Sequence, residues 1–217
     1  MKFAFVFPGQ GSQAVGMLNA WGDNAEVKRT LDEASEALGE DVAKLIAEGP
    51  AEALSLTTNT QPVMLTAGVA FYRAWLAAGG AIPKVMAGHS LGEYSALVAS
   101  GVISFKDAVP LVRFRAEAMQ SAVPVGTGGM AAILGLDDAT VIKVCAEAST
   151  ASAGVVEAVN FNAPGQVVIA GASDAVTKAC ELLKAAGAKR ALPLPVSAPF
   201  HSSLLQPASE KLKGYLA

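Results

Sequence analysis

The sequence has little charge, few aromatic residues and very few cysteines or histidines. Of its 217 residues, 16% are charged and 6% are aromatic, whereas 52% are hydrophobic, and there are 2 cysteines and 2 histidines. This composition excludes a disordered chain, which stays unfolded because it combines low hydrophobicity with high net charge. The formal net charge of -3 and the lack of any run of Lys or Arg argue against a nucleic-acid partner.

Long apolar runs are also missing from the sequence. The longest uncharged stretch, residues 53–72, has a polar middle and does not predict a membrane span. The apolar run at residues 3–7 ends at Pro8, too early for a signal peptide. Cys145 and Cys180 each fall on an apolar helical stripe, which predicts buried, reduced thiols. We therefore expect a cytoplasmic protein with no membrane partner. We also expect a monomer, although no feature of the sequence specifies the oligomeric state.

Hydrophobic periodicity predicts an α/β order in the first half of the chain. A short apolar run that ends at Pro8 and Gly9 is typical of a strand buried in a parallel sheet. Helical patterns follow, and Gly39 is suited to end the first of them. The expected elements are strands at residues 3–7 and 84–87 and helices at residues 25–38, 42–47, 62–78 and 91–99. Alternation of this kind is typical of an α/β domain.

The second half of the chain has a different pattern. A glycine-rich stretch at residues 123–129 is typical of a hinge or linker. Beyond it we expect strands at residues 130–134, 155–160, 166–170 and 190–196 and helices at residues 138–148 and 174–186. This β-α-β-β-α-β order is the ferredoxin-like pattern. It predicts a small subdomain at residues 125–196, inserted into a larger domain made of residues 1–124 and 197–217.

Gly88-His89-Ser90-Leu91-Gly92 matches the G-x-S-x-G pattern of a nucleophile elbow. A predicted strand precedes it and a predicted helix follows it, as an elbow requires. The glycines would let strand and helix approach without Cβ clashes, while the serine hydroxyl is exposed on a sharp turn. Ser90 is therefore the candidate nucleophile. The alternative is a glycine-rich loop that packs tightly and has no chemical role.

A nucleophilic serine needs a base, and the chain offers only His89 and His201. His89 adjoins the serine, so its side chain should point away from the hydroxyl. His201 follows a predicted strand end and turn, and it is the better candidate. Few carboxylates lie where a third member could be expected. We infer a Ser-His dyad whose imidazole is oriented by a neutral group, although a loop histidine without function is the alternative.

The predicted helix at residues 105–121 contains two arginines of different character. Arg113 has Glu117 four residues on and predicts a solvated i,i+4 pair. Arg115 shares the apolar face of the helix, where a cation is costly unless an anion meets it. Arg115 is thus a candidate clamp for a substrate carboxylate. The alternatives are an arginine that extends to the surface or pairs with an internal Asp or Glu.

The loop after the first strand, residues 9–14, superficially matches the dinucleotide fingerprint G-x-G-x-x-G/A. Dinucleotide binding would need a second strand that ends in an acidic residue, yet Asp32 and Glu33 lie in the middle of a predicted helix. The alternative is a backbone loop that offers an N–H group toward Ser90, as one half of an oxyanion hole.

Six segments spread over the whole chain form a set that is more specific than any one of them. They are Phe7-Pro8-Gly9-Gln10-Gly11-Ser12-Gln13, Thr60-Gln61-Pro62, Gly88-His89-Ser90-Leu91-Gly92-Glu93-Tyr94, Arg115, Asn160-Phe161-Asn162-Ala163-Pro164-Gly165-Gln166 and Ser197-Ala198-Pro199-Phe200-His201. In this order they resemble the malonyl-CoA:acyl carrier protein transacylases of bacterial type II fatty acid synthesis. The resemblance implies an α/β-hydrolase-like core with a parallel sheet and an inserted ferredoxin-like subdomain.

The resemblance also implies roles for individual residues. Ser90 would be the nucleophile and His201 its base, and the backbone N–H groups of Gln10 and Leu91 would form the oxyanion hole. The substrates would be malonyl-CoA and the phosphopantetheine thiol of acyl carrier protein, with no metal and no cofactor.

Three further residues would contact the substrate according to the same resemblance. Arg115 would hold the malonyl carboxylate, and Gln61 would line the site. Phe200 would crowd an α-methyl branch and so favour malonyl over methylmalonyl groups.

Other interpretations stay open at this point. A serine thioesterase or hydrolase could use the same dyad. Two further alternatives are a malonyl-selective acyltransferase domain of a polyketide synthase and a non-catalytic docking module for a carrier protein. Chains of the family continue well past the histidine, so we expect missing C-terminal elements and exposed apolar surface. Lys178, Lys184, Lys189 and Arg190 could supply a basic patch for an acidic carrier protein, and the alternative is that they are scattered solubilising charges.

Overall fold

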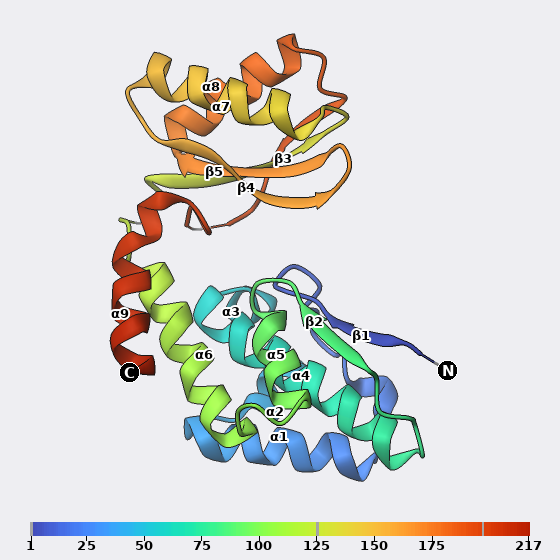
Figure 1. Cartoon of the computed structure of the whole chain (residues 1–217). Coiled ribbons are helices and arrows are strands. Elements are labelled where there is room, and N and C mark those ends of the chain that lie inside the picture. Colours follow the sequence, from blue (N-terminus) through green and yellow to red (C-terminus); the bar gives the residue numbers. More distant parts are fainter. Residues whose placement is uncertain (1, 125, 197) are drawn as a thin grey trace. The chain divides into compact units, whose positions relative to one another are not determined.

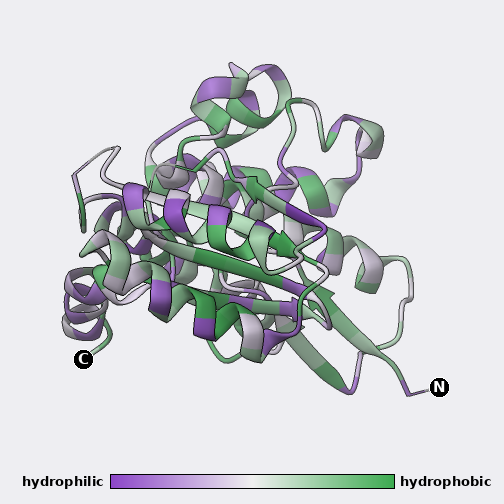
Figure 2. Ribbon diagram, turned by 90° about the horizontal axis from the view of Figure 1, so that it is seen from above, coloured by the Kyte–Doolittle hydropathy of each residue, from purple (hydrophilic) through white to green (hydrophobic). Residues whose placement is uncertain are grey.

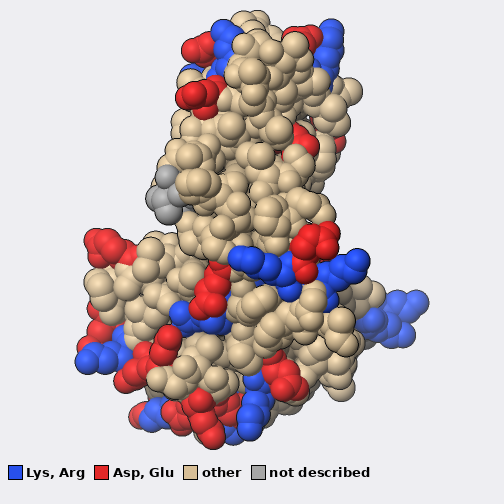
Figure 3. Space-filling view, turned by 90° about the vertical axis from the view of Figure 1, so that its left-hand side faces the viewer, with Lys and Arg blue, Asp and Glu red and all other residues tan. Residues whose placement is uncertain are grey.

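The computed structural model describes residues 2–124, 126–196 and 198–217. Contacts divide the chain into two compact units, Met1–Glu117 and Ala118–Ala217 (Figure 1). In the described part of the chain, no helix is both long and apolar enough to cross a membrane. The face drawn in Figure 3 has wide uncharged areas, with basic and acidic groups interspersed, as the low charge content leads one to expect.

The first unit contains a parallel pair of strands, β1 (Ala4–Phe7) and β2 (Val85–Gly88). On one face the rings of Phe5 and Phe7 contact Tyr72 edge-on, with centroids 5.6 and 6.5 Å from it. On the other face Val6 is 75% exposed and Val85 60% exposed. Both predicted strands are confirmed to within one residue, but the prediction that the first strand is buried in the sheet is wrong for this face, where Val6 is exposed.

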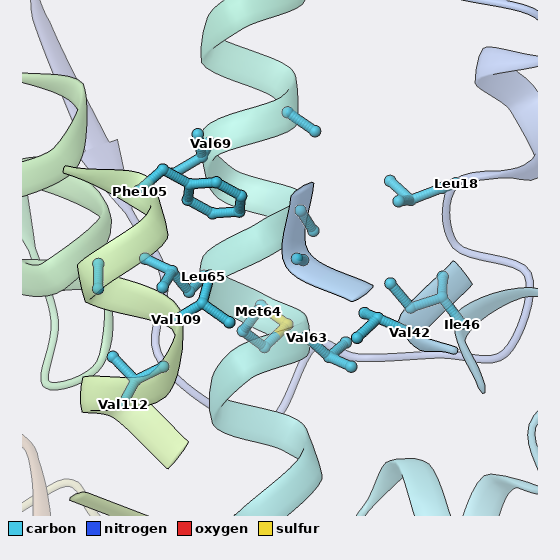
Figure 4. Close-up of a cluster of buried hydrophobic side chains, with 14 of the residues drawn as sticks. Leu18, Val42, Ile46, Val63, Met64, Leu65, Val69, Phe105, Val109 and Val112 are labelled. Carbon is cyan, nitrogen blue, oxygen red and sulfur yellow. The ribbon is translucent and has the colours of Figure 1, made fainter. Parts of the chain in front are cut away.

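The helices of the first unit surround a central helix, α4. In chain order they are the 3₁₀ helix η1 (Asn19–Trp21), α1 (Ala25–Leu38), α2 (Val42–Glu48), α3 (Ala51–Leu54), α4 (Thr57–Ala77), α5 (Gly92–Ala99) and α6 (Phe105–Gln120). Side chains of α4 such as Val63, Leu65 and Val69 lie in a cluster with residues of α2 and α6 (Figure 4). Figure 2 shows hydrophobic and hydrophilic residues alternating along the helices that face the viewer. α4 is thus the element that the other helices cover.

Helix α4 begins at Thr57, so the prediction of a start at Pro62 was wrong. The cause is local hydrogen bonding ahead of the proline. Thr60 Oγ1 donates to the carbonyl oxygens of Leu54 and Leu56 at 2.7 and 3.0 Å, and Asn59 Nδ2 donates to Ala53 at 2.9 Å. These bonds satisfy carbonyl groups around the α3–α4 turn and keep a polar segment helical and buried. As a result Gln61 lies on a helix in the interior.

Two helix ends in the first unit are capped locally, and the one at Gly39 confirms the prediction. Gly39 ends α1 in the left-handed conformation, with φ of 65°. Ser104 Oγ accepts from the backbone N–H of Asp107 at 3.1 Å and donates to its carboxylate at 2.6 Å, and this interaction caps the start of α6.

The second unit contains an antiparallel sheet with strand order β4-β5-β3-β6. Its elements are β3 (Gly128–Leu134), α7 (Asp138–Ser152), β4 (Val156–Ala163), β5 (Gln166–Ala172), α8 (Ser173–Ala185), β6 (Arg190–Pro193), the 3₁₀ helix η2 (Ser203–Leu205) and α9 (Gln206–Leu216). Helices α7 and α8 cover one face of the sheet (Figure 1). On the other face, Met130 and Val168 cluster with Phe200, Leu205 and Ala208. The predicted β-α-β-β-α-β order is confirmed.

The predicted linker and the last predicted strand are too long. Gly128 and Gly129 belong to β3, and a Cβ at Gly128 would lie 2.4 Å from the ring of Pro199, so close packing explains this glycine. Strand β6 ends at Pro193 and does not continue to residue 196. The predicted domain boundaries at residues 125 and 197 fall outside the described residues.

Cys145 and Cys180 are buried free thiols between α7, α8 and the sheet, as predicted. Burial raises the pKa of the Cys145 thiol to about 12 and raises the pKa of Cys180 as well. Both thiols therefore stay protonated and unreactive at neutral pH.

Candidate active site

Ser90 lies on the turn between β2 and α5, in the strand-turn-helix setting of an elbow. Its φ of 52° is in the left-handed region, which costs a non-glycine residue about 1 to 2 kcal/mol. The flanking glycines are required sterically. A Cβ at Gly88 would lie 1.9 Å from the carbonyl carbon of Gly92, and one at Gly92 would lie 2.1 Å from Phe7 O. The turn is therefore a strained feature held by the surrounding backbone.

The guanidinium of Arg115, on α6, lies against this serine. Its Nη2 donates to Ser90 Oγ at 3.1 Å and its Nη1 donates to Gln61 Oε1 at 2.6 Å. The guanidinium carbon lies 5.5 Å from the centre of the Tyr94 ring. Arg115 is only 8% exposed, so it neither reaches the surface nor acts as a solvated charge. The helical periodicity predicted this inward position correctly.

Arg115 forms no ion pair with a carboxylate among the described residues. Burial lowers the pKa of its guanidinium, and Tyr94 and Glu93 offset part of this effect. Burying a cation among neutral partners costs free energy, which an incoming anion can recover. The geometry is therefore suited to bind a carboxylate close to Ser90 Oγ.

Gln61 connects Arg115 to the loop that follows β1. Its Nε2 donates to Gln10 Oε1 at 3.2 Å, and Gln10 Nε2 donates to Thr57 Oγ1 at 3.4 Å. Both partners of Gln10 lie on α4, one helical turn apart. The side chain of Gln10 thus bonds to two residues of one helix.

The loops after β1 and β2 approach each other closely. A Cβ at Gly9 would lie 2.9 Å from the carbonyl oxygen of His89. The backbone N–H groups of Gln10 and Leu91 donate to no acceptor within the described residues. An oxyanion hole is formed by backbone N–H donors of this kind, which lie on neighbouring loops beside a nucleophilic serine.

The dinucleotide interpretation finds no support in the first unit. Asp32 and Glu33 lie within α1, and Glu33 pairs with Arg73 at 2.8 Å and Arg29 at 2.7 Å. The element after β1 is a helix, so the second strand that the dinucleotide fingerprint needs does not follow it.

His201 and Phe200 lie in the second unit, before η2. His201 has φ of 67°, a left-handed conformation that is costly for histidine. Phe200 is buried beside Leu205 and Ala208. The segment is fixed further by Glu157, whose Oε2 accepts from the backbone N–H of Ser203 at 2.7 Å.

Sequence reasoning missed two contact residues and one ion pair. Tyr94 lies four residues after Ser90, a spacing that could have suggested a shared helix face, whereas nothing local indicated the contact of Thr57 with Gln10. The predicted pair between Arg113 and Glu117 is wrong, because Arg113 bonds to Glu40 at 2.6 Å and to Asn59 at 3.1 Å. Long-range packing thus decided this partner.

Comparison with known proteins agrees with the motif set. The acyl transferase domain family model matches residues 4–217. The malonyl CoA-acyl carrier protein transacylases of Escherichia coli K12 and Salmonella typhimurium are 60% and 59% identical over 217 residues, which is 100% of this chain and 70% of each relative. That of Bacillus subtilis is 51% identical over 216 residues, or 99% of this chain and 68% of the relative.

Solved structures of similar proteins have the same fold. An acyl-carrier-protein S-malonyltransferase from Burkholderia pseudomallei 1710b superposes with a TM-score of 0.97 at 75% identity, covering 100% of this chain and 70% of that one. A malonyl-transacylase in complex with a type II polyketide synthase acyl carrier protein superposes with a TM-score of 0.96 at 52% identity, with the same coverage.

Proposed function

The chain belongs to the malonyl CoA-acyl carrier protein transacylases, within the acyl transferase family, and we propose that it moves malonyl groups from malonyl-CoA to acyl carrier protein for fatty acid biosynthesis. One observation carries this proposal from the chain's own residues. A buried guanidinium with no internal carboxylate partner among the described residues lies 3.1 Å from the hydroxyl of an elbow serine. A serine esterase for uncharged acyl groups would have no use for that cation.

Ser90 is the nucleophile of the proposed reaction, and His201 is its base. The support for Ser90 is the strained turn and the glycines that it requires. The support for His201 is its place in the family motif Ser197-Ala198-Pro199-Phe200-His201. The backbone N–H groups of Gln10 and Leu91 stabilise the oxyanion, each contributing on the order of 3 kcal/mol to the transition state.

The reaction proceeds by a ping-pong sequence. Ser90 Oγ attacks the carbonyl carbon of the malonyl thioester while its proton passes to the imidazole of His201. The tetrahedral intermediate then collapses, the carbon–sulfur bond breaks and CoA leaves as the thiol with that proton. In the second half, the phosphopantetheine thiol of the carrier protein attacks the malonyl-serine ester and restores the Ser90 hydroxyl. The proposal includes no metal and no cofactor.

Arg115 selects the substrate by binding the free carboxylate of the malonyl group. The bond to Gln61 fixes one side of the guanidinium, so Gln61 lines the acyl pocket as well. Phe200 crowds the space that an α-methyl branch would need, in this proposal, and disfavours methylmalonyl groups. The carrier protein is acidic in this proposal and meets the basic residues Lys184, Lys189 and Arg190, none of which forms an ion pair within the described part of the chain.

The architecture proposed for this function has an α/β-hydrolase-like core, residues 1–124 and 197–217, and a ferredoxin-like subdomain, residues 125–196. The parallel pairing of β1 with β2 and the serine turn after β2 support the first. The strand order β4-β5-β3-β6 with two helices on one face supports the second. We propose further that the protein acts as a monomer in the cytoplasm.

Intact-mass measurement after incubation with malonyl-CoA tests the proposed function. A malonyl adduct should form, disappear when an acyl carrier protein is added, and be absent from a Ser90→Ala variant. A folded wild-type protein that acquires no adduct would refute the transferase proposal. An adduct that is lost to water as fast as to the carrier protein would favour a thioesterase.

A further inference from the structure

The amide of Gln61 is the junction between the guanidinium and the loop after β1. We propose that Gln61 is a positioning residue that determines acyl specificity: its neutral amide orients Arg115 without neutralising it and anchors Gln10 at the same time. This inference rests on the proposed function and specifies how that site distinguishes a carboxylated acyl group from an uncharged one.

The oxygen and the nitrogen of the Gln61 amide bond to two different residues. The side chain is fully buried on α4, at 0% exposure. Its Oε1 accepts from Arg115 at 2.6 Å, and its Nε2 donates to Gln10 at 3.2 Å. Only a side chain with an acceptor and a donor on one planar group can form both bonds. A glutamate could accept from Arg115 but could not donate to Gln10, and a methionine could do neither.

Because Arg115 is buried, the charge of the side chain at position 61 strongly affects how well Arg115 binds an anion. Among the described residues, the close contacts of Arg115 are with neutral groups, namely Gln61, Ser90 and the ring of Tyr94. Glu93 raises the pKa of Arg115 from a distance but forms no ion pair with it. A carboxylate at position 61 would lie at the same 2.6 Å and would be a permanent anion for the guanidinium. The malonyl carboxylate would then meet a neutralised pair and a second negative charge.

The bond from Gln61 to Gln10 gives the same residue a second effect. Gln10 is held by Gln61 and Thr57, and its backbone N–H is one of the proposed oxyanion donors. Donors stabilise a transition state only when their positions are fixed beforehand. Loss of the amide at position 61 should therefore slow the loading of every acyl group, charged or not.

The test compares Gln61→Glu, Gln61→Met and wild type in the acylation of Ser90 by malonyl-CoA and acetyl-CoA. Initial rates of adduct formation give kcat and KM for each thioester. Gln61→Glu should lower the malonyl-to-acetyl ratio of kcat/KM at least about 100-fold. Gln61→Met leaves Arg115 with its charge. Its kcat should therefore be about 10-fold lower with each thioester, while the malonyl-to-acetyl ratio of kcat/KM should change by less than about 10-fold.

The control is Gln206→Glu, which adds the same charge at an exposed position of α9. It should leave both rates and their ratio unchanged. Circular dichroism and thermal melting identify any variant that does not fold. An unchanged ratio in folded Gln61→Glu would overturn the specificity role. If that variant does not fold, wild-type malonyl kinetics in Gln61→Met would overturn the positioning role. Failure of the wild type to form an adduct would instead refute the proposed function.

Discussion

The strongest test of the site is the removal of the buried charge by Arg115→Met. The side chain keeps most of its volume, so the change removes the guanidinium more than the packing. In the proposed complex the guanidinium gives the malonyl carboxylate two charge-assisted hydrogen bonds, each contributing about 1.5 to 3 kcal/mol. Allowing for the bond to Ser90 that is given up when the carboxylate binds, the net loss is about 3 to 4 kcal/mol. At 1.36 kcal/mol per factor of ten, this corresponds to a decrease of roughly 150- to 900-fold in kcat/KM for acylation by malonyl-CoA.

The assay is the rate of Ser90 acylation by malonyl-CoA and by acetyl-CoA, followed by intact mass. The rate of malonyl loading should fall by the stated factor. The rate of acetyl loading should change by less than about 10-fold, because the acetyl group has no carboxylate for Arg115 to bind. The matched control is Arg113→Met on the same helix. Arg113 bonds to Glu40 and Asn59, away from Ser90, so both rates should stay near those of wild type. An equal loss for both thioesters in Arg115→Met would refute the clamp.

Three further outcomes follow from the geometry. Gly92→Ala should lower the free energy of unfolding by about 3 kcal/mol or more in urea denaturation, because its Cβ would lie 2.1 Å from a backbone carbonyl oxygen. Gly214 lies on α9 with open space around it, so Gly214→Ala should instead raise the free energy of unfolding by about 0.5 to 1 kcal/mol. Equal changes in the free energy of unfolding for the two variants would contradict the packing argument. Phe200→Ser should narrow the preference for malonyl-CoA over methylmalonyl-CoA, and unchanged selectivity would contradict the crowding role. Iodoacetamide at pH 8 should label Cys145 and Cys180 only after denaturation, since burial raises the pKa of Cys145 to about 12; labelling of the folded protein would contradict this.

Local patterns in the sequence accounted for the elements whose causes are themselves local. The apolar run that ends at Pro8 predicted β1, and Gly39 predicted the end of α1. The G-x-S-x-G spacing predicted the turn at Ser90, because close approach of strand and helix requires glycine on both sides. The 3.6-residue period placed Arg115 on the inward face of α6. Each of these features depends on residues that are neighbours in the chain.

Other features depended on contacts that no local pattern encodes. The start of α4 was predicted at Pro62, a residue that often begins helices, but bonds from Thr60 to carbonyl groups before the helix moved the start to Thr57. Arg113 was expected to pair along its own helix, but Glu40, 73 residues away, lies within reach. In both cases tertiary contacts outweighed a weak local preference.

The sequence by itself determined the family, the elbow serine and the inward position of a cation on α6. Only the tertiary structure showed which groups meet that cation. Gln61 and Arg115 are 54 residues apart, and Gln61 and Gln10 are 51 apart. Their hydrogen bonds exist because α4, α6 and the loop after β1 pack together. Such contacts depend on the position of whole elements, and residue types and spacing along the chain do not specify that position.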